Sequence, residues 1–301
     1  MIRISKDGTL PAEAVPGAGA LGPGPGAGSA GARAFRLLPD LPRLVIMRVH
    51  VISDVHGRTD ALATAADGAD ALICLGDLLL FVDYADHRRG IFADLFGAEA
   101  ARQFIALRTA QRFDEARAMS ARLWAGLGGD KAAHVDAAAS RQYAELFRVL
   151  PTPSYLTYGN VDIPRMWEAY LRPGQRVLDG ERVELGGWSF GFVGGGLKSP
   201  YRTPYEIDDE AYAAKVAAVG EVDVLCAHIP PDVPELLFDT VAQRLERGSA
   251  ALLDAVRRTQ PRYLLFGHVH QPLASRLRIG RTECVNVGHF RATGTPHVLA
   301  W

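Results

Sequence analysis

The sequence has little net charge, few cysteines and no long apolar segment. Its 33 basic and 34 acidic residues leave a formal charge of −1, so no global positive field recruits nucleic acid. No stretch reaches the roughly 18 consecutive apolar residues of a membrane-spanning helix. The first ten residues carry charges and precede no apolar block, which argues against a secretory signal. We therefore expect no membrane partner and do not expect a nucleic-acid partner.

The three cysteines, Cys74, Cys226 and Cys284, each lie inside a short apolar run. A reduced cysteine in such a run behaves as a small apolar side chain. Secreted chains tend to pair their thiols, whereas an odd number leaves one thiol over. We therefore expect a cytoplasmic protein without disulfides.

Residues 11–33 consist mostly of alanine, glycine and proline. Such a composition cannot bury enough apolar surface to offset the loss of conformational entropy on folding. We predict a disordered tail over residues 1–43 and one folded domain over residues 44–301. Met47 lies inside the first β-rich run, so a start at this residue is an alternative that the sequence leaves open.

Short apolar runs that end in turn-forming or polar residues recur along the folded part and predict β-strands. They span residues 44–52, 71–75, 154–158, 222–227, 263–266 and 284–287. Helical patterns lie between several of them, at residues 59–66, 209–219 and 250–258. This alternation predicts the α/β class. Four shorter segments indicate antiparallel strands in a mixed sheet or in a second sheet packed on the first. They are residues 183–185, 188–193, 275–279 and 297–301.

Residues 83–150 contain no strand pattern. Apolar residues at helical spacing predict two helices, separated by glycines at residues 126–129. We interpret the segment as a helical insertion. It is either a packing element at the domain edge or a cap over a substrate site, because long insertions in compact domains are often functional.

Polar side chains follow five of the predicted strands directly, at the edge of an α/β sheet where ligands collect. The motifs are Asp54-Val55-His56, Gly76-Asp77, Gly159-Asn160-Val161-Asp162, Ala227-His228 and Gly267-His268-Val269-His270. Taken singly, such residues are more often caps or satisfied polar groups. Five motifs together indicate a shared site, and glycine before a ligand permits the sharp turn that aims it. Imidazole and carboxylate without thiolate suit Mn, Fe, Zn or Co.

The order of these motifs resembles the calcineurin-like metallophosphoesterases, whose signature is D-x-H, G-D, G-N-x-D/E, a strand-end histidine and G-H-x-H. The resemblance runs from about Met47 to His289. It implies a β-sandwich flanked by helices (α/β/β/α), here with the helical insertion. It also implies hydrolysis of a small phosphodiester or phosphomonoester substrate.

The resemblance further implies two divalent metal ions, with Mn expected and Fe, Zn, Co or Ni as alternatives. One ion would be held by Asp54, His56 and His270, and the other by Asn160, His228 and His268, with Asp77 bridging the two. In that family a hydroxide shared by the two metals attacks phosphorus in line, while the metals neutralise charge on the phosphoryl oxygens.

Val161 departs from the commonest family pattern, which has a histidine at this position that stabilises the transition state or protonates the leaving oxygen. A branch of small metallophosphoesterases also lacks that histidine. The change favours phosphodiesters or esters with good leaving groups. The alternative is a catalytically weak scaffold that binds a protein partner, as in the related retromer subunit, although a pure scaffold has no physical reason to retain a complete ligand set.

Three further residues are candidates for the site. Asp162 is expected to have a catalytic role by orienting Asn160 or a ligand imidazole, or else to cap a helix before Pro164. Arg58 is a candidate to bind the substrate phosphate, or is simply solvated. His289 follows another strand end and is a candidate to contact the substrate in place of the missing histidine.

Overall fold

Two β-sheets stacked on each other form the centre of residues 46–301, the part of the chain that the computed structural model describes. The predicted tail, residues 1–43, lies outside the described residues. The first sheet has the order β15-β1-β2-β3-β4. Its strands are β1 (Arg48–Ile52), β2 (Ala71–Cys74), β3 (Ser154–Leu156), β4 (Gln175–Val177) and β15 (His297–Ala300). β1 to β4 are parallel, and β15 is antiparallel to β1.

The second sheet has the order β13-β14-β12-β9-β6-β5. Its strands are β5 (Glu181–Leu185), β6 (Trp188–Val193), β9 (Val224–Ala227), β12 (Tyr263–Phe266), β13 (Arg276–Ile279) and β14 (Thr282–Asn286). The four inner strands are parallel, whereas the edge strands β5 and β13 are antiparallel to their neighbours. The segments expected to be antiparallel therefore form edges, except that β6 also pairs in parallel with β9.

Successive side chains along the inner strands point to opposite faces of the sheet, and both sets are apolar, so both faces of each sheet are covered. In β2, Ala71 and Ile73 face the space between the sheets, while Leu72 and Cys74 face the helices. In β9, Val224 and Cys226 face the same inter-sheet core, and the two residues alternating with them belong to a third cluster under the helices on the other side. The predicted α/β/β/α sandwich is therefore confirmed.

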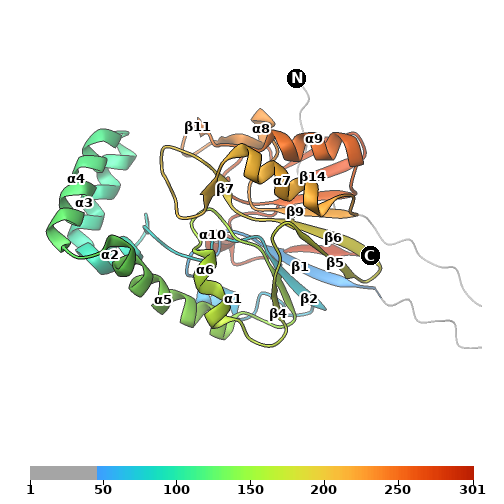
Figure 1. Ribbon diagram of the computed structural model, residues 1–301, viewed down its shortest axis with the longest axis horizontal. Helices are drawn as coiled ribbons and strands as arrows, with labels where there is room; N and C mark the ends of the chain where they lie inside the picture. Colours follow the sequence, from blue (N-terminus) through green and yellow to red (C-terminus); the bar gives the residue numbers. More distant parts are fainter. Residues whose placement is uncertain (1–45) are drawn as a thin grey trace, which may run out of the picture. The chain divides into compact units, whose positions relative to one another are not determined.

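Helices cover the two outer faces of the sandwich (Figure 1). On the first sheet lie α1 (Thr59–Leu62), α5 (Lys131–Val149), α6 (Pro164–Trp167) and the 3₁₀ helix η1 (Glu168–Tyr170). On the second lie α7 (Asp209–Val219), α8 (Pro234–Leu237) and α9 (Ala250–Thr259). Short elements complete the described part: β7 (Gly196–Leu197), β8 (Glu206–Ile207), β10 (Phe238–Asp239), β11 (Arg244–Leu245) and α10 (Phe290–Thr293).

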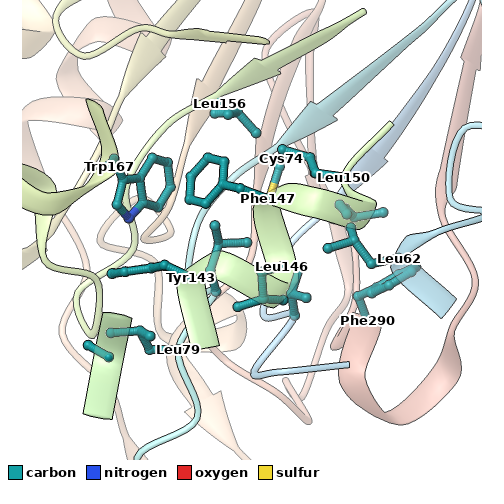
Figure 2. Packing of buried hydrophobic residues seen from close by; sticks show 14 of the residues in the cluster. Leu62, Cys74, Leu79, Tyr143, Leu146, Phe147, Leu150, Leu156, Trp167 and Phe290 are labelled. Carbon is teal, nitrogen blue, oxygen red and sulfur yellow. The ribbon is translucent and has the colours of Figure 1, made fainter. Parts of the chain in front are cut away.

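The insertion is helical, as predicted, and contains four helices. They are α2 (Ile91–Phe96), α3 (Ala98–Thr109), α4 (Phe113–Leu127) and α5. The side chain of Asp130 caps α5 by accepting a hydrogen bond from the N–H of Ala132. Tyr143, Leu146 and Phe147 on α5 are buried against the first sheet, as their helical spacing predicts (Figure 2). α5 is thus a core helix, which anchors the insertion beside the strand ends.

The three cysteines are buried and free, on β2, β9 and β14. No helix within residues 46–301 combines the length and apolar character needed to cross a membrane.

Candidate metal centre

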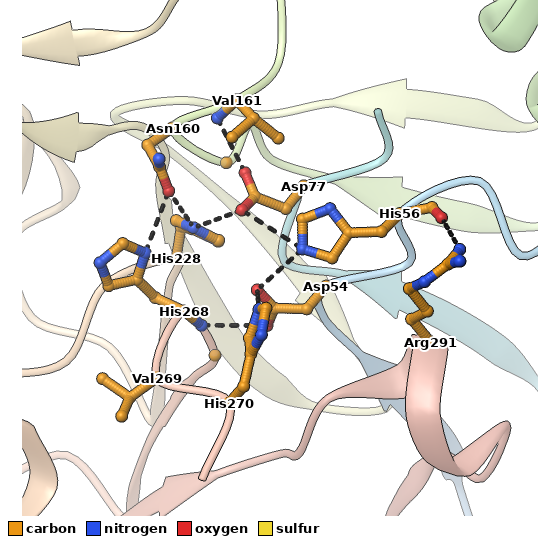
Figure 3. A network of polar contacts seen from close by, with 12 residues as sticks. Asp54, His56, Asp77, Asn160, Val161, His228, His268, Val269, His270 and Arg291 are labelled. Atoms are coloured by element: carbon orange, nitrogen blue, oxygen red, sulfur yellow. Dashed lines mark hydrogen bonds and ion pairs between the residues drawn. The ribbon is translucent and has the colours of Figure 1, made fainter. Parts of the chain in front are cut away.

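The carboxyl ends of β1, β2, β3, β9 and β12 meet at one edge of the sandwich, and the loops that follow them carry all seven expected ligands. Backbone hydrogen bonds continue between these loops beyond the strands. The N–H of Asp54 donates to Gly76, and the N–H of His56 donates to Asp77. The loops therefore keep the register of the sheet, and the polar side chains point toward a common centre (Figure 3).

On one side of this centre lie Asp54, His56 and His270, which we call position A. The Oδ1 atom of Asp54 is 3.3 Å from the Nε2 atom of His270 and 3.8 Å from the Nε2 atom of His56. The other oxygen of Asp54 accepts a hydrogen bond of 2.9 Å from the N–H of His268. One oxygen of Asp54 is therefore fixed by the backbone, and the other faces the two imidazoles.

On the other side lie Asn160, His228 and His268, which we call position B. The Oδ1 atom of Asn160 is 3.0 Å from the Nε2 atom of His228 and 3.0 Å from the Nδ1 atom of His268. Three potential ligand atoms thus converge, although their residues follow three different strands.

Asp77 lies between the two positions. Its Oδ2 atom is 3.4 Å from the Nε2 atom of His228 and 3.8 Å from the Nε2 atom of His56. Its Oδ1 atom accepts a hydrogen bond of 2.9 Å from the N–H of Val161. A single oxygen of Asp77 therefore faces both positions, which is the placement that a bridging ligand requires.

A sequence model of the calcineurin-like phosphoesterases matches residues 47–272. The chain belongs to this family. Among solved structures, it is similar to the protein TT1561 of Thermus thermophilus at 14% sequence identity and a TM-score of 0.50, over 85% of this chain and 99% of that one. At that identity the similarity supports the fold alone. No curated protein matches the chain.

The donor set of this calcineurin-like phosphoesterase fits the metal ions that the family implies. Within residues 46–301, the Oδ1 atom of Asp54 and the Nε2 atom of His56 are buried and have no hydrogen-bond partner. A buried polar atom without a partner is costly, and a cation between these two atoms would satisfy both. Groups able to hold a metal include Asp54, His56 and Asp77 on one side, and Asp77, His228 and His268 on the other.

Backbone carbonyls orient two of the imidazoles. The Nδ1 atom of His56 lies 2.8 Å from the carbonyl oxygen of Leu79, and that of His228 lies 2.9 Å from the carbonyl oxygen of Leu75. In both rings Nδ1 carries the proton that is donated to the carbonyl, so the Nε2 atom faces the centre.

The amide of Asn160 is oriented by residues that the sequence gives no signal for. Its Nδ2 atom donates a hydrogen bond of 3.0 Å to the hydroxyl of Thr203, which donates one of 2.8 Å to Glu206. This chain of hydrogen bonds fixes which amide atom faces His228 and His268, namely the oxygen. Thr203 lies in the loop between β7 and β8, far from every recognisable motif.

The buried carboxyl groups and imidazoles set each other's charge. Burial disfavours ionised Asp54 and Asp77, but His270 holds the pKa of Asp54 well below its ordinary value, and His228 lowers the pKa of Asp77. Burial disfavours protonated His228 as well, yet the charge of Asp77 raises the pKa of His228 to about 9. Both carboxylates are therefore ionised at neutral pH, and a cation that binds His228 must displace a proton.

Four of the ligand residues have left-handed backbone conformations, which L-amino acids other than glycine rarely adopt. The φ angles are 59° at Asp54, 41° at His56, 56° at Asp77 and 69° at His268. Such conformations concentrate at functional sites because the surrounding structure imposes them.

The glycines before the ligands provide space more than sharp turns. Only Gly76 among them has a positive φ, of 98°. A Cβ atom on Gly76 would lie 1.9 Å from the backbone nitrogen of Gly159, and one on Gly159 would lie 1.9 Å from the Oδ1 atom of Asp77. A Cβ atom on Gly267 would lie 2.4 Å from the Oδ2 atom of Asp54. The ligand loops therefore touch where only glycine fits.

Asp162 is fully buried and holds two ligand loops together. Its carboxylate accepts hydrogen bonds from the N–H groups of Asp77 (2.8 Å), Leu78 (3.0 Å) and Gly159 (2.8 Å). Burial and the charge of Asp77 raise the pKa of Asp162 to about 7. Its hydrogen bonds reach the backbone of Asp77 rather than Asn160 or an imidazole, and the N-cap residue of α6 is Ile163.

Arg58 contacts the backbone of α10. Its Nη1 atom donates to the carbonyl oxygens of Arg291 (2.6 Å) and Ala292 (3.1 Å). Its expected contact with a phosphate stays a prediction. Arg291, which no sequence motif marks, pairs with buried Asp83 and donates to the carbonyl oxygen of His56. These contacts fasten the start of the insertion to position A.

His289 lies at position A. Its ring stacks on His270, with the ring centroids 3.8 Å apart and the planes at 10°, and meets the ring of His56 edge-on. Burial and the neighbouring His270 lower the pKa of His289 to about 3. It is therefore neutral, and its expected contact with the substrate stays a prediction.

Proposed function

We propose that the protein is a dinuclear metal-dependent hydrolase of phosphodiesters, or of phosphomonoesters with good leaving groups. The observation that carries the proposal is the convergence of positions A and B on one oxygen of Asp77. Family membership supplies the reaction class, because the family is that of phosphoesterases. Mn is the metal that we propose, with Fe, Zn, Co or Ni as alternatives.

The residues of the chain hold the potential metal ligands in place and fix their orientation. Asp77 faces both positions, and the carbonyls of Leu75 and Leu79 fix the tautomers of two imidazoles. The chemistry supplied by divalent cations in these positions is Lewis acidity, which acidifies water and offsets the charge of a phosphoryl group. The rigid loops hold the ligand atoms without rearrangement at the moment of reaction, which is the condition for electrostatic catalysis.

Val161 sets the limit on the leaving group. Its side chain packs against the core cluster around α5 and has no proton to give. An alkoxide that leaves without a proton is a poor leaving group, whereas a phenolate departs readily. Val161 thus favours aryl esters and activated diesters over alkyl monoesters.

A small hollow of about 30 Å³ lies beside position B and borders the space that the remainder of the substrate would occupy. Its lining includes Asn160 and His268 together with Tyr201 and Arg247. The carboxylates of Glu206 and Glu246 also line it and offset the guanidinium, so the aromatic ring of Tyr201 is the feature that suits an aryl ester.

The test is turnover by the Mn-loaded full chain on bis(4-nitrophenyl) phosphate, 4-nitrophenyl phosphate and an alkyl monoester. We expect metal-dependent release in that order of rates, and none from an Asp54→Asn variant, since this change removes a negative ligand charge without altering size. A wild-type chain that binds about two ions yet hydrolyses none of the three esters would instead support the scaffold alternative.

A further inference from the structure

The residues around position A include one imidazole more than the motifs of the family account for. His289 lies directly after β14 and Gly288, outside the matched residues 47–272. Its place is fixed by the backbone, because the next two residues donate hydrogen bonds to the loop after β1. The N–H of Phe290 donates to Ser53, and the N–H of Arg291 donates to Asp54. His289 is therefore held against position A by the same loop that carries Asp54.

Both ring nitrogens of His289 are buried, and neither has a hydrogen-bond partner among residues 46–301. An imidazole that merely fills a core normally donates one hydrogen bond, as His50 does to the carbonyl oxygen of Ala65 at 2.9 Å. A proton donor for a leaving group would have to face the substrate, whereas these nitrogens have no exposed surface. Neither role explains His289.

A cation explains it. One nitrogen each of His56, His270 and His289 lie within 4.8 Å of one another. Because the lone pair of an imidazole lies in the ring plane, the stacked ring of His289 has to turn relative to that of His270 for both to bind a single ion. The Nε2 atom of His56 is also the buried atom without a partner that faces Asp54 and Asp77. His56 therefore belongs to two groups of potential ligands, one with the imidazoles of His270 and His289 and one with the carboxylates of Asp54 and Asp77.

We propose that His289 is an additional protein ligand of the cation at position A. This inference rests on the proposed function in that both require metal at this edge. It gives position A three imidazoles, against two at position B, with Asp77 shared. More nitrogen donors favour Zn, Co, Ni or Fe over Mn. The two positions then differ in affinity and in metal preference.

The decisive variant is His289→Phe, because phenylalanine keeps a ring stacked on His270 and removes both nitrogens. The metal-free full chain is titrated with Zn and with Co in competition with a chelator, and the visible absorption of the Co-loaded protein is recorded. We expect one of two ions to bind at least about 10- to 100-fold more weakly, since even partners that only orient a ligand cost that much. The Co spectrum changes, and the melting temperature of the metal-free protein does not fall.

His297→Phe is the matched control, because His297 lies on the edge strand β15 and belongs to none of the groups able to hold a metal among the described residues. It is expected to leave both dissociation constants and the Co spectrum unchanged. If His289→Phe fails to fold, His289→Ala, which leaves space in place of a ring, is measured in the same way.

The outcomes separate the two proposals. Equal dissociation constants and equal Co spectra for wild type and a folded His289 variant would overturn the assignment of His289 and leave the hydrolase intact. Two bound ions with a weakened site in the variant, but no ester hydrolysis by wild type, would sink the proposed function alone. A wild-type chain that takes up no divalent metal would overturn both.

Discussion

The ligand edge and the tip of the insertion, which consists of α3 and α4, are held together in opposite ways. At the ligand edge, contacts join residues far apart in the chain, such as the N–H of His268 and the carboxylate of Asp54. At the tip, ion pairs join residues three apart on exposed helix surfaces, as in Glu99 with Arg102. Exposed pairs of this kind contribute little. A small cluster around Phe92 and Phe104 supplies most of the apolar contact there.

This difference suggests separate roles: the ligand edge for the proposed reaction, and the tip for access of the substrate to it. Because the edge depends on contacts between distant segments, a single change there spreads to several ligands. The tip depends on contacts between residues close in the sequence. Its described link to the hollow is Tyr201. The guanidinium carbon of Arg108 on α3 lies 5.2 Å from the centroid of the Tyr201 ring, and that of Arg244 on β11 lies 4.9 Å from it. We therefore expect substitutions at the edge to abolish turnover or stability, and changes at the tip to alter only which esters are accepted.

Asp77→Asn tests the contrast most severely. The amide keeps the size of the side chain but removes the one charge that both positions share, so we expect turnover to fall at least about 1,000-fold. Turnover on the aryl diester and bound metal per chain are the measurements. Full activity together with two bound ions would show that Asp77 does not bridge.

His228→Ala removes one imidazole of position B. We expect turnover to fall about 100-fold or more and one bound ion to be lost, because a fully buried nitrogen facing Asn160 and Asp77 disappears. The partly exposed His134 on α5 provides a matched His→Ala control with unchanged turnover. Retention of two tightly bound ions would contradict the assignment of His228.

Asp162→Ala separates positioning from ligation. It leaves three buried N–H groups without their acceptor, so we expect the free energy of unfolding of the metal-free protein to fall by about 3 kcal/mol. Urea denaturation monitored by tryptophan fluorescence measures this. A loss of turnover with unchanged stability would mean that Asp162 acts on the reaction directly.

Thr203→Val is a smaller change at the same edge. It keeps the shape of the side chain and removes the hydroxyl that accepts from Asn160, so the amide is free to turn its nitrogen toward the imidazoles. We expect affinity for one ion to fall about 10-fold, with little change in the unfolding midpoint. Chelator competition measures the affinity, and Thr259→Val on α9 is the control.

Removal of the tip is expected to have the least effect. In the variant, a short Gly-Ser linker joins Gly97 to Gly128 in place of α3 and α4. Turnover of the small aryl diester should stay within about twofold, while the ratio of KM values for bulky and small esters changes because Tyr201 loses Arg108. A collapse of turnover on the small ester would erase the contrast between edge and tip.

The sequence predicts the ligand edge far better than the tip. Asp54, Asn160 and His228 are recognisable because each directly follows an apolar strand, and parallel strands bring their carboxyl ends to one edge. α5 is recognisable from its buried face. α2 and α3 are not recognisable individually, since their apolar residues form a small local cluster and leave no long periodic face.

Residues that only position the side chains of other residues leave no recognisable pattern in the sequence. Thr203 in the loop before β8 and Glu206 at the start of β8 orient Asn160, and Gly196 packs so closely against Asn160 that a Cβ atom there would lie 2.7 Å from the Cβ atom of Asn160. Arg291 and Asp83, which are 208 positions apart in the chain, meet only because α10 docks beside the insertion. The two-residue strands β7, β8, β10 and β11 escape prediction for the same reason, because their pairing is set by tertiary contacts.

The left-handed conformations of Asp54, His56, Asp77 and His268 lower the stability of the protein at this edge. Each costs on the order of 1 kcal/mol relative to glycine, so four of the proposed metal ligands are also positions at which the backbone is strained. A laboratory selection for heat resistance alone would tend to replace them, with glycine or asparagine the favoured substitutes at such angles. Under the proposed function, selection for metal binding would oppose their replacement.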